Sequence, residues 1–171
     1  SAYGDISITG YAGAGGGNQT GVALTAGVQV LSTGTGADAA AISITGYGGD
    51  EAGALANMRG VFLEGATTLV RSVDGEISIT GYGGENTTST GAYGVHISAA
   101  KVEATDAADI VISGIGGGTA GASDATGVYM DSGARVNSAS GTIDITGTGS
   151  LHATGTTNHG VYIEGNSKVV S

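Results

Sequence analysis

Acidic side chains recur at one position of this sequence, three residues after the valine of a repeated Gly-Val pair. Glu64, Asp131 and Glu164 occupy this position in three copies of the pair, and Thr25 and Ser98 occupy it in the other two. Carboxyl groups paired on neighbouring strands carry out glycoside cleavage, and carboxylate oxygens also bind calcium. Because no Lys or Arg recurs beside them, we expect a solvated acidic stripe without catalytic residues, with weak calcium binding as the alternative.

A glycine-rich segment with adjacent acidic residues, Asp50 and Glu51, also suggests calcium. Calcium-binding solenoids repeat Gly-Gly-x-Gly-x-Asp every nine residues, and that period is absent here. We therefore expect Asp50, Glu51 and Glu85 to keep loops soluble, and we expect no cofactor.

Ring-bearing side chains recur directly after the valines of the same Gly-Val pairs. In chain order this position holds Ala23, Phe62, His96, Tyr129 and Tyr162. A row of outward-pointing rings could stack on sugars or contact a neighbouring fibre, and the alternative is packing beneath a glycine-rich loop. The three histidines, His96, His152 and His159, are too scattered to indicate a metal site.

Paired hydroxyl side chains form a third set. They are Ser7, Thr9, Ser43, Thr45, Ser78 and Thr80. Parallel rows of hydroxyls on a solenoid resemble the ice-binding face of antifreeze β-helices, although Val111 and Asp144 interrupt the pattern in later copies. Ice binding is therefore an alternative function, and ordinary solvent-facing strand residues are the simpler interpretation.

All three sets lie within a repeat that runs through the whole chain. Its first segment has the form Ile-Ser-Ile-Thr-Gly-Tyr. The copies of this segment begin at Ile6, Ile42, Ile77, Ile110 and Ile143, so the intervals between them are 36, 35, 33 and 33 residues. The Gly-Val pairs of the second segment begin at Gly21, Gly60, Gly94, Gly127 and Gly160. A third apolar position follows at Val30, Leu69, Val102, Val136 and Val169. We therefore divide a single domain, 1–171, into units of about 4–38, 39–74, 75–107, 108–140 and 141–171.

Apolar and polar residues alternate within these segments, which is the period of a half-buried strand. The alternation predicts Ile79 and Val95 in the core and Ser78 and Thr80 outside it. A unit of three short strands cannot bury its apolar face alone, so the units must stack. The predicted fold is all-β, a parallel β-solenoid of five coils with 33–36 residues and three short strands in each coil, about 24 Å long. We also expect the rings of Tyr11, Tyr47 and Tyr82 to stack on one another beside the sheet that the first strands of the coils form.

Composition excludes several classes of partner. The chain contains 35 glycines among 171 residues but no proline and no Gly-X-Y period, so neither collagen nor a disordered coil fits. A net charge of −10 repels nucleic acid and anionic membranes. The absence of cysteine rules out disulfides and suits the outside of a bacterium. No apolar stretch approaches the roughly 20 residues of a transmembrane helix, so we expect no transmembrane segment in this sequence.

Units of the form Ile-Ser-Ile-Thr-Gly-Tyr-Gly-Gly followed by Gly-Val-Tyr-Ile-Glu-Gly resemble the β-strand repeats of filamentous-haemagglutinin-like bacterial surface adhesins. The resemblance covers the whole chain and implies a right-handed parallel β-helix, export, an extracellular or cell-surface location and a role in adhesion or surface structure. That family has no shared catalytic motif, so no functional residue carries over. We expect a structural or adhesive protein and not an enzyme, with surface glycans or neighbouring fibres as partners. The alternatives are an ice-binding β-helix and a glycan-binding or glycan-cleaving β-helix.

The two ends of the chain match in phase. In the second, third and fourth units, seven or eight residues lead from the third apolar position to the next first-strand isoleucine, as from Val102 to Ile110. Counting from Val169 to the chain end and on from Ser1 to Ile6 again gives eight. Two interpretations stay open: an excerpt of a longer repeat protein, or copies that stack end to end by strand addition. In the second case the expected interface residues are Ile6, Ile8, Val161, Ile163 and Val169.

Overall fold

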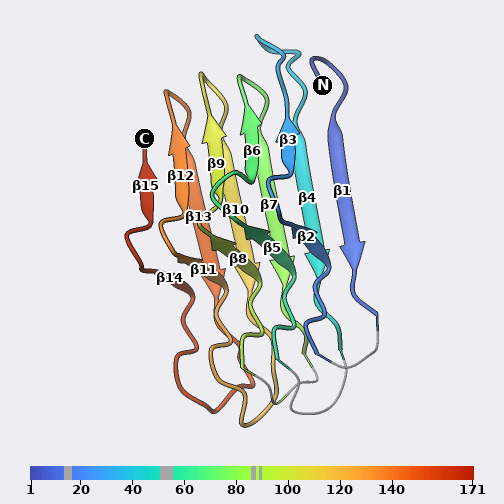
Figure 1. Cartoon of the computed structure of the whole chain (residues 1–171), viewed down its shortest axis with the longest axis vertical. Helices are drawn as coiled ribbons and strands as arrows, with labels where there is room; N and C mark the ends of the chain where they lie inside the picture. The colour runs from blue at the N-terminus through green and yellow to red at the C-terminus, as the bar shows by residue number, and fades with distance from the viewer. Residues whose placement is uncertain (14–16, 51–55, 86–87, 89) are drawn as a thin grey trace.

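The chain folds as a parallel β-solenoid. The computed structural model describes residues 1–171 except 14–16, 51–55, 86–87 and 89. Within the described ranges every regular element is a β-strand. Each of the five coils contains three strands, and the coils follow one another along the axis of the solenoid (Figure 1). The predicted all-β parallel β-helix is therefore confirmed. No helix capable of crossing a membrane is found among the described residues.

Each of the three sheets contains one strand from every coil. The first sheet consists of β1 (Ile6–Tyr11), β4 (Ile42–Tyr47), β7 (Ile77–Tyr82), β10 (Ile110–Ile115) and β13 (Ile143–Thr148). The second sheet consists of β2 (Val22–Leu24), β5 (Val61–Glu64), β8 (Val95–Ser98), β11 (Val128–Asp131) and β14 (Val161–Ile163). The third sheet consists of β3 (Gln29–Leu31), β6 (Leu69–Ser72), β9 (Lys101–Ala104), β12 (Arg135–Ser138) and β15 (Lys168–Val170).

The core lies between the three sheets and is built from identical residues stacked in register. Ile42 pairs with Ile77, and Val61 pairs with Val95, so aliphatic side chains form continuous rows along the axis. Ile79 and Val95 are fully buried, as the alternation predicts, whereas Ser78 on the opposite face of β7 is only half-buried. Stacked β-branched side chains pack well on a pleated surface, which explains the Ile and Val content of these rows.

One core residue of the third sheet was predicted wrongly. The spacing places Leu69 in line with Val30 and Val102, but the structure pairs Val70 with these two residues, and Val70 is fully buried. Leu69 lies one residue earlier, half-buried and paired with Lys101. Both residues are apolar, so the local sequence allows either one to point inward. A one-residue shift in register would turn every side chain of the strand to the opposite face. The backbone pairing with the neighbouring coils selects the register in which Val70 points inward.

Glycines hold the first and second sheets close together. A Cβ atom added to Gly81 at the end of β7 would lie 2.0 Å from the carbonyl oxygen of Gly94, just before β8. No side chain fits in that space, so glycine is required at this position. The close approach places the residue before Gly94 next to the outer surface of the second sheet, where the ring-bearing side chains lie.

Aspartates connect successive coils at the corner between the third and first sheets. Asp74 accepts hydrogen bonds from the backbone N–H groups of Gly36 (2.6 Å) and Ala107 (3.1 Å), on the coils before and after its own. Asp109 accepts bonds from the N–H (2.6 Å) and the hydroxyl (2.8 Å) of Thr142. These hydrogen bonds lower the pKa of both carboxyl groups.

Candidate functional site

The rings predicted to form a row do lie together. We call Phe62, His96, Tyr129 and Tyr162 the aromatic flank; they occupy paired positions of β5, β8, β11 and β14 on the outer face of the second sheet. The ring centroids are 4.9 Å apart between Phe62 and His96, 4.8 Å between His96 and Tyr129, and 5.5 Å between Tyr129 and Tyr162. The spacing follows the strand separation of the sheet, so the rigid backbone positions the rings.

His96 departs from the prediction of an outward, accessible row. Its exposed fraction is only 6%, whereas Tyr162 at the end of the row is 37% exposed. Tyr93 covers it, with ring centroids 5.0 Å from those of both His96 and Tyr129. The aromatic flank is thus partly exposed and partly a packed layer, and His96 belongs to the packed part.

The residues that cover the flank form a second column, which we had not predicted. It consists of Arg59, Tyr93, Thr126 and His159, each directly before the glycine of a Gly-Val pair. Ladder hydrogen bonds align them: Tyr93 accepts from the N–H of Gly60, Thr126 from that of Gly94, and His159 from that of Gly127. A recurrent position directly before each Gly-Val pair was visible in the sequence, but its residue types differ from copy to copy, so composition did not reveal it.

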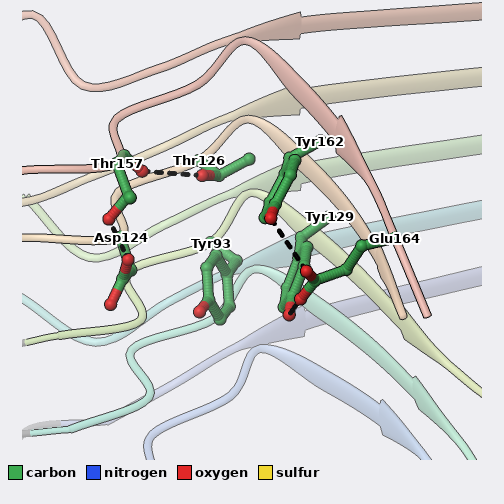
Figure 2. A pocket seen from close by; sticks show the side chains of 7 residues that line it. All are labelled: Tyr93, Asp124, Thr126, Tyr129, Thr157, Tyr162 and Glu164. Carbon is green, nitrogen blue, oxygen red and sulfur yellow. Dashed lines mark hydrogen bonds between the residues drawn. The ribbon is translucent and has the colours of Figure 1, made fainter. Parts of the chain in front are cut away.

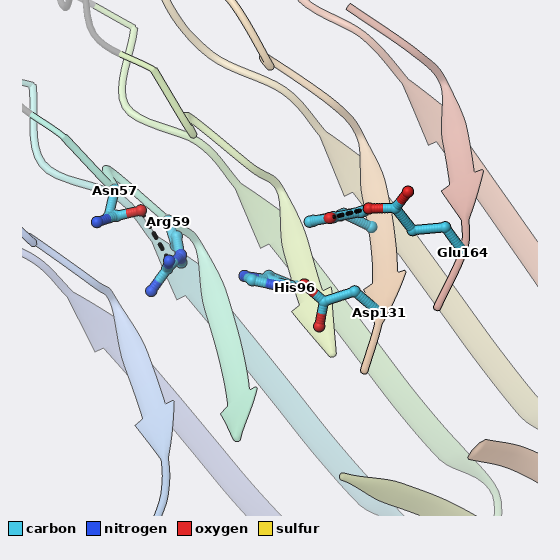
Figure 3. Close-up of polar contacts among 6 residues, drawn as sticks. Asn57, Arg59, His96, Asp131 and Glu164 are labelled. Atoms are coloured by element: carbon cyan, nitrogen blue, oxygen red, sulfur yellow. Dashed lines mark hydrogen bonds and ion pairs between the residues drawn. The ribbon is translucent and has the colours of Figure 1, made fainter. Parts of the chain in front are cut away.

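Arg59 lies at one end of this packed layer. Its guanidinium carbon lies 4.0 Å from the centroid of the Phe62 ring, and its Nη2 donates a 2.7 Å hydrogen bond to Oδ1 of Asn57. Figure 3 shows Arg59, His96 and Asp131 on successive coils. Burial lowers the pKa of Arg59, but a guanidinium stays charged, so the layer holds one positive charge beside the imidazole.

His96 is held uncharged by this environment. Burial, followed by the charge of Arg59, lowers its pKa to about 4. Its Nε2 lies 3.3 Å from Oδ2 of Asp131. Although burial raises the pKa of Asp131, hydrogen bonds from Ser98 and His96 bring it below its ordinary value, so the carboxylate accepts and Nε2 donates. Nδ1 of His96 is then a buried acceptor without a hydrogen-bond partner in the described part of the chain.

Glu164 is held by the two outer tyrosines. The hydroxyl of Tyr129 donates to Oε1 at 2.5 Å, and that of Tyr162 donates to Oε2 at 2.8 Å (Figure 2). These bonds lower the pKa of Glu164 and raise the pKa of Tyr162. Burial, followed by the bond to Glu164, raises the pKa of Tyr129. At neutral pH the group is therefore one carboxylate bound by two phenols.

A pocket of about 260 Å³ opens beside this group. Its lining side chains are Tyr93, Asp124, Thr126, Tyr129, Thr157, Tyr162 and Glu164. Figure 2 shows Asp124 and Thr157 on one side, the tyrosines and Glu164 on the other, and Tyr93 between them. The Thr157 hydroxyl donates to the Asp124 carboxylate. The pocket thus combines tyrosine rings with acceptors and hydroxyls, a combination suited to binding a polyhydroxylated ligand.

The acidic stripe proves to have two kinds of member. Asp131 and Glu164 follow Tyr129 and Tyr162 and make the internal bonds described above, whereas Glu64 is exposed. Among the described residues, no group of three or more His, Cys, Asp or Glu side chains could hold a metal ion. In the glycine-rich loops, Asp50 accepts a bond from the N–H of Glu85 (2.8 Å), while Glu51 lies outside the described residues.

The hydroxyl rows and the tyrosine stack lie along the first sheet. The Ser7, Ser43 and Ser78 row is continued by Val111 and Asp144, as the sequence indicated. The second row is continuous through all five coils; its members are Thr9, Thr45, Thr80, Ser113 and Thr146. The predicted tyrosine stack is confirmed, with centroids 4.7 Å apart between Tyr11 and Tyr47 and 4.9 Å apart between Tyr47 and Tyr82.

The residues predicted for end-to-end contact lie at opposite ends of the solenoid. Ile6 and Ile8 on β1 are half-buried. Val161, Ile163 and Val169 on β14 and β15 are 39%, 42% and 41% exposed, although the equivalent residues of the inner coils are buried. Within one chain these two groups do not meet. In comparisons with protein-family models, with curated proteins and with solved structures, nothing matches this chain.

Proposed function

We propose that this chain is a non-enzymatic structural or adhesive β-solenoid that works outside the cell, as a segment of a bacterial surface adhesin or as a fibre subunit. The aromatic flank is the observation that supports this function best. A rigid frame holds its rings in register, and the outermost ring, Tyr162, is open to solvent. Aromatic side chains on a rigid surface are efficient contact groups because little conformational entropy is lost when they bind.

The carboxylates beside the flank support a binding role over a catalytic one. Glycoside cleavage needs one protonated and one ionised carboxyl group facing the same bond. Asp131 and Glu164 both have lowered pKa values, so neither is a proton donor at neutral pH. Both are also engaged in hydrogen bonds to His96 or to tyrosine hydroxyls.

End-to-end assembly is part of the proposal. Strand β1 has the sequence Ile-Ser-Ile-Thr-Gly-Tyr and β13 has Ile-Asp-Ile-Thr-Gly-Thr, so the register seen between coils could continue from one copy to the next. Such a contact would cover Ile6 and Ile8 of one copy with the last coil of another. Because the contact is heterologous and does not close, it would propagate into a filament.

Electron microscopy and sedimentation of the purified chain at micromolar concentration test assembly. We expect filaments from the unaltered chain and none from Val169→Lys, which puts a charge on an exposed edge strand. Ile115→Lys is the matched control, since Ile115 is 45% exposed but lies on β10, in an inner coil away from both ends. An unaltered chain that stays monomeric would exclude the fibre subunit. Binding of labelled chain to whole cells tests the adhesive role separately, and release of reducing sugars would overturn the non-enzymatic assignment.

Ice binding is the second candidate, and one observation favours it. The row of Thr9, Thr45, Thr80, Ser113 and Thr146 carries a hydroxyl in every coil at the strand spacing. Thermal hysteresis of the pure chain, compared with Thr80→Tyr in the middle of the row, tests it. Hysteresis that is present in the unaltered chain and absent in the variant would place ice binding first.

A further inference from the structure

The pocket beside the aromatic flank originates in a size difference within the second column. This column holds a large side chain at Arg59, Tyr93 and His159 but a small one at Thr126. The four positions are aligned by ladder hydrogen bonds on consecutive coils. Coils are separated by about 4.8 Å, so Tyr93 and the coil of His159 lie about 9.6 Å apart, with room for one flat ring between them. Thr126 lies buried at the base of this space.

Tyr93 offers a ring face to this space. The guanidinium of Arg59 lies 6.0 Å from the Tyr93 centroid and comes from the preceding coil. Thr126 and Thr157, which line the pocket, come from the two following coils. The ring therefore has the arginine on one side and, beside the tilted ring of Tyr129, the pocket on the other.

The other two tyrosines present hydroxyl edges to the pocket. Tyr129 and Tyr162 are stacked with an interplanar angle of 8°, so each covers a face of the other. Their hydroxyls lie on Glu164, and the carboxylate of Asp124 with the Thr157 hydroxyl lies across the pocket. The pocket thus has one apolar face and polar groups around its rim, which matches the shape of a pyranose ring with an apolar face and equatorial hydroxyls.

Charge narrows the class of ligand. The lining contains two carboxylates, of Asp124 and Glu164, and no Lys, Arg or His, so sulfated or uronic-acid glycans would be repelled. A bound ammonium group prefers several ring faces, and here the faces of Tyr129 and Tyr162 are largely covered by each other. The lining therefore disfavours an anionic ligand and offers no aromatic cage for an ammonium group.

We propose that the pocket binds one unit of a neutral saccharide, with the apolar face of the sugar on Tyr93 and its hydroxyls hydrogen-bonded to Asp124, Thr157 and Glu164. Its volume of about 260 Å³ lies just below the roughly 300 Å³ at which pockets for drug-sized ligands begin, which suits a single sugar ring. The inference rests on the proposed adhesive role and names its ligand. A single open site of this kind binds weakly, with a Kd on the order of 1 mM, so adhesion would depend on many copies.

The test titrates the full chain with neutral disaccharides of glucose, galactose and mannose, by saturation-transfer NMR and then calorimetry. Thr126→Tyr should complete the aromatic column, fill the pocket and weaken binding at least about 10-fold. Thr20→Tyr is the matched control, because Thr20 holds the same position in the first coil, away from the pocket, and should leave the Kd unchanged. Tyr93→Leu, which keeps an apolar side chain but removes the stacking face, is expected to weaken binding as much as Thr126→Tyr does.

The outcomes separate this inference from the proposed function. Absence of binding to every neutral disaccharide at about 10 mM, or equal binding by Thr126→Tyr and the unaltered chain, overturns the inference. A preference for glucosamine oligomers or for sulfated oligosaccharides over neutral ones overturns it too. If Thr126→Tyr fails to fold by circular dichroism, the Tyr93→Leu result decides. Filament formation and cell binding are measured on the same samples, so an adhesive role that survives loss of the sugar site is seen directly.

Discussion

The imidazole of His96 lies 3.3 Å from the carboxylate of Asp131 on the next coil, inside a layer of rings that keeps it uncharged. Arg59, Tyr93, Tyr129 and Asp131 are the charged or titratable groups around it. Of these, Arg59 opposes a proton on His96, and Asp131 favours one. Burial is the largest effect and decides the outcome, so the folded chain holds His96 neutral over a pH range in which the unfolded chain protonates it.

Mild acid is therefore expected to destabilise the fold. The pKa of His96 is about 4 in the folded chain against an ordinary value of 6.5, so between these values the unfolded chain binds more protons. The contribution of neutral His96 to the free energy of unfolding is fully present above about pH 6.5. It is lost as the pH falls toward 4, and the total loss is on the order of 3 kcal/mol. Urea unfolding at about pH 7.5 and about pH 4.5 measures the loss.

Two variants assign this loss to the right histidine. His96→Phe replaces the imidazole with a ring of similar size that does not titrate, and most of the acid dependence should vanish. His152→Gln removes an exposed histidine and should leave the dependence intact. If His96→Phe loses as much stability in acid as the unaltered chain, the neutral buried imidazole is not its cause.

The two faces of β7 should respond differently to truncation. Ile79→Ala removes a fully buried side chain from the middle coil and should cost about 2–5 kcal/mol in the free energy of unfolding. Ser78→Ala, on the outer face of the same strand, should cost less than about 0.5 kcal/mol. Equal losses in urea titrations would contradict the alternation of the first sheet.

The register of the third sheet can be tested with two adjacent residues. Val70→Ala should cost about 2 kcal/mol because Val70 is fully buried between Val30 and Val102. Leu69→Ala removes more atoms but should cost less than about 1 kcal/mol, because Leu69 is half-buried beside Lys101. A larger loss at Leu69 would restore the register expected from the sequence.

Glycine at the junction of the first two sheets should be irreplaceable. Gly81→Ala places a Cβ 2.0 Å from the backbone oxygen of Gly94, so the two sheets must move apart, at a cost of about 3 kcal/mol or more. Gly13→Ala is the matched control, since no atom lies within 4 Å of an added Cβ there. Thermal unfolding, monitored by circular dichroism, compares the stability of the two variants. If Gly81→Ala were as stable as Gly13→Ala, the two sheets could move apart at this junction at little cost.

The solenoid could be predicted from the repeat alone. Period-2 alternation and a near-constant repeat admit one arrangement, in which equivalent residues stack, so the ladders from Ile6 to Ile143 and from Val22 to Val161 followed from spacing alone. The same rule predicted the aromatic flank, because residues at equivalent positions of each coil must become neighbours. It also predicted the tyrosine stack on the first sheet.

The accessibility of the side chains and the partners they contact depend on how the coils pack in three dimensions. His96 was expected to point outward, and it does lie on the outer face of its strand, yet Tyr93 covers it. That contact depends on how closely the glycine junction brings the end of the loop to the second sheet, a distance that spacing along the chain does not contain. Leu69 and Val70 differ for a similar reason, since two adjacent apolar residues satisfy the local pattern equally and the ladder between coils chooses one. The pocket depends on three coils at once, because Tyr93, Thr126 and Thr157, which line it, come from successive coils.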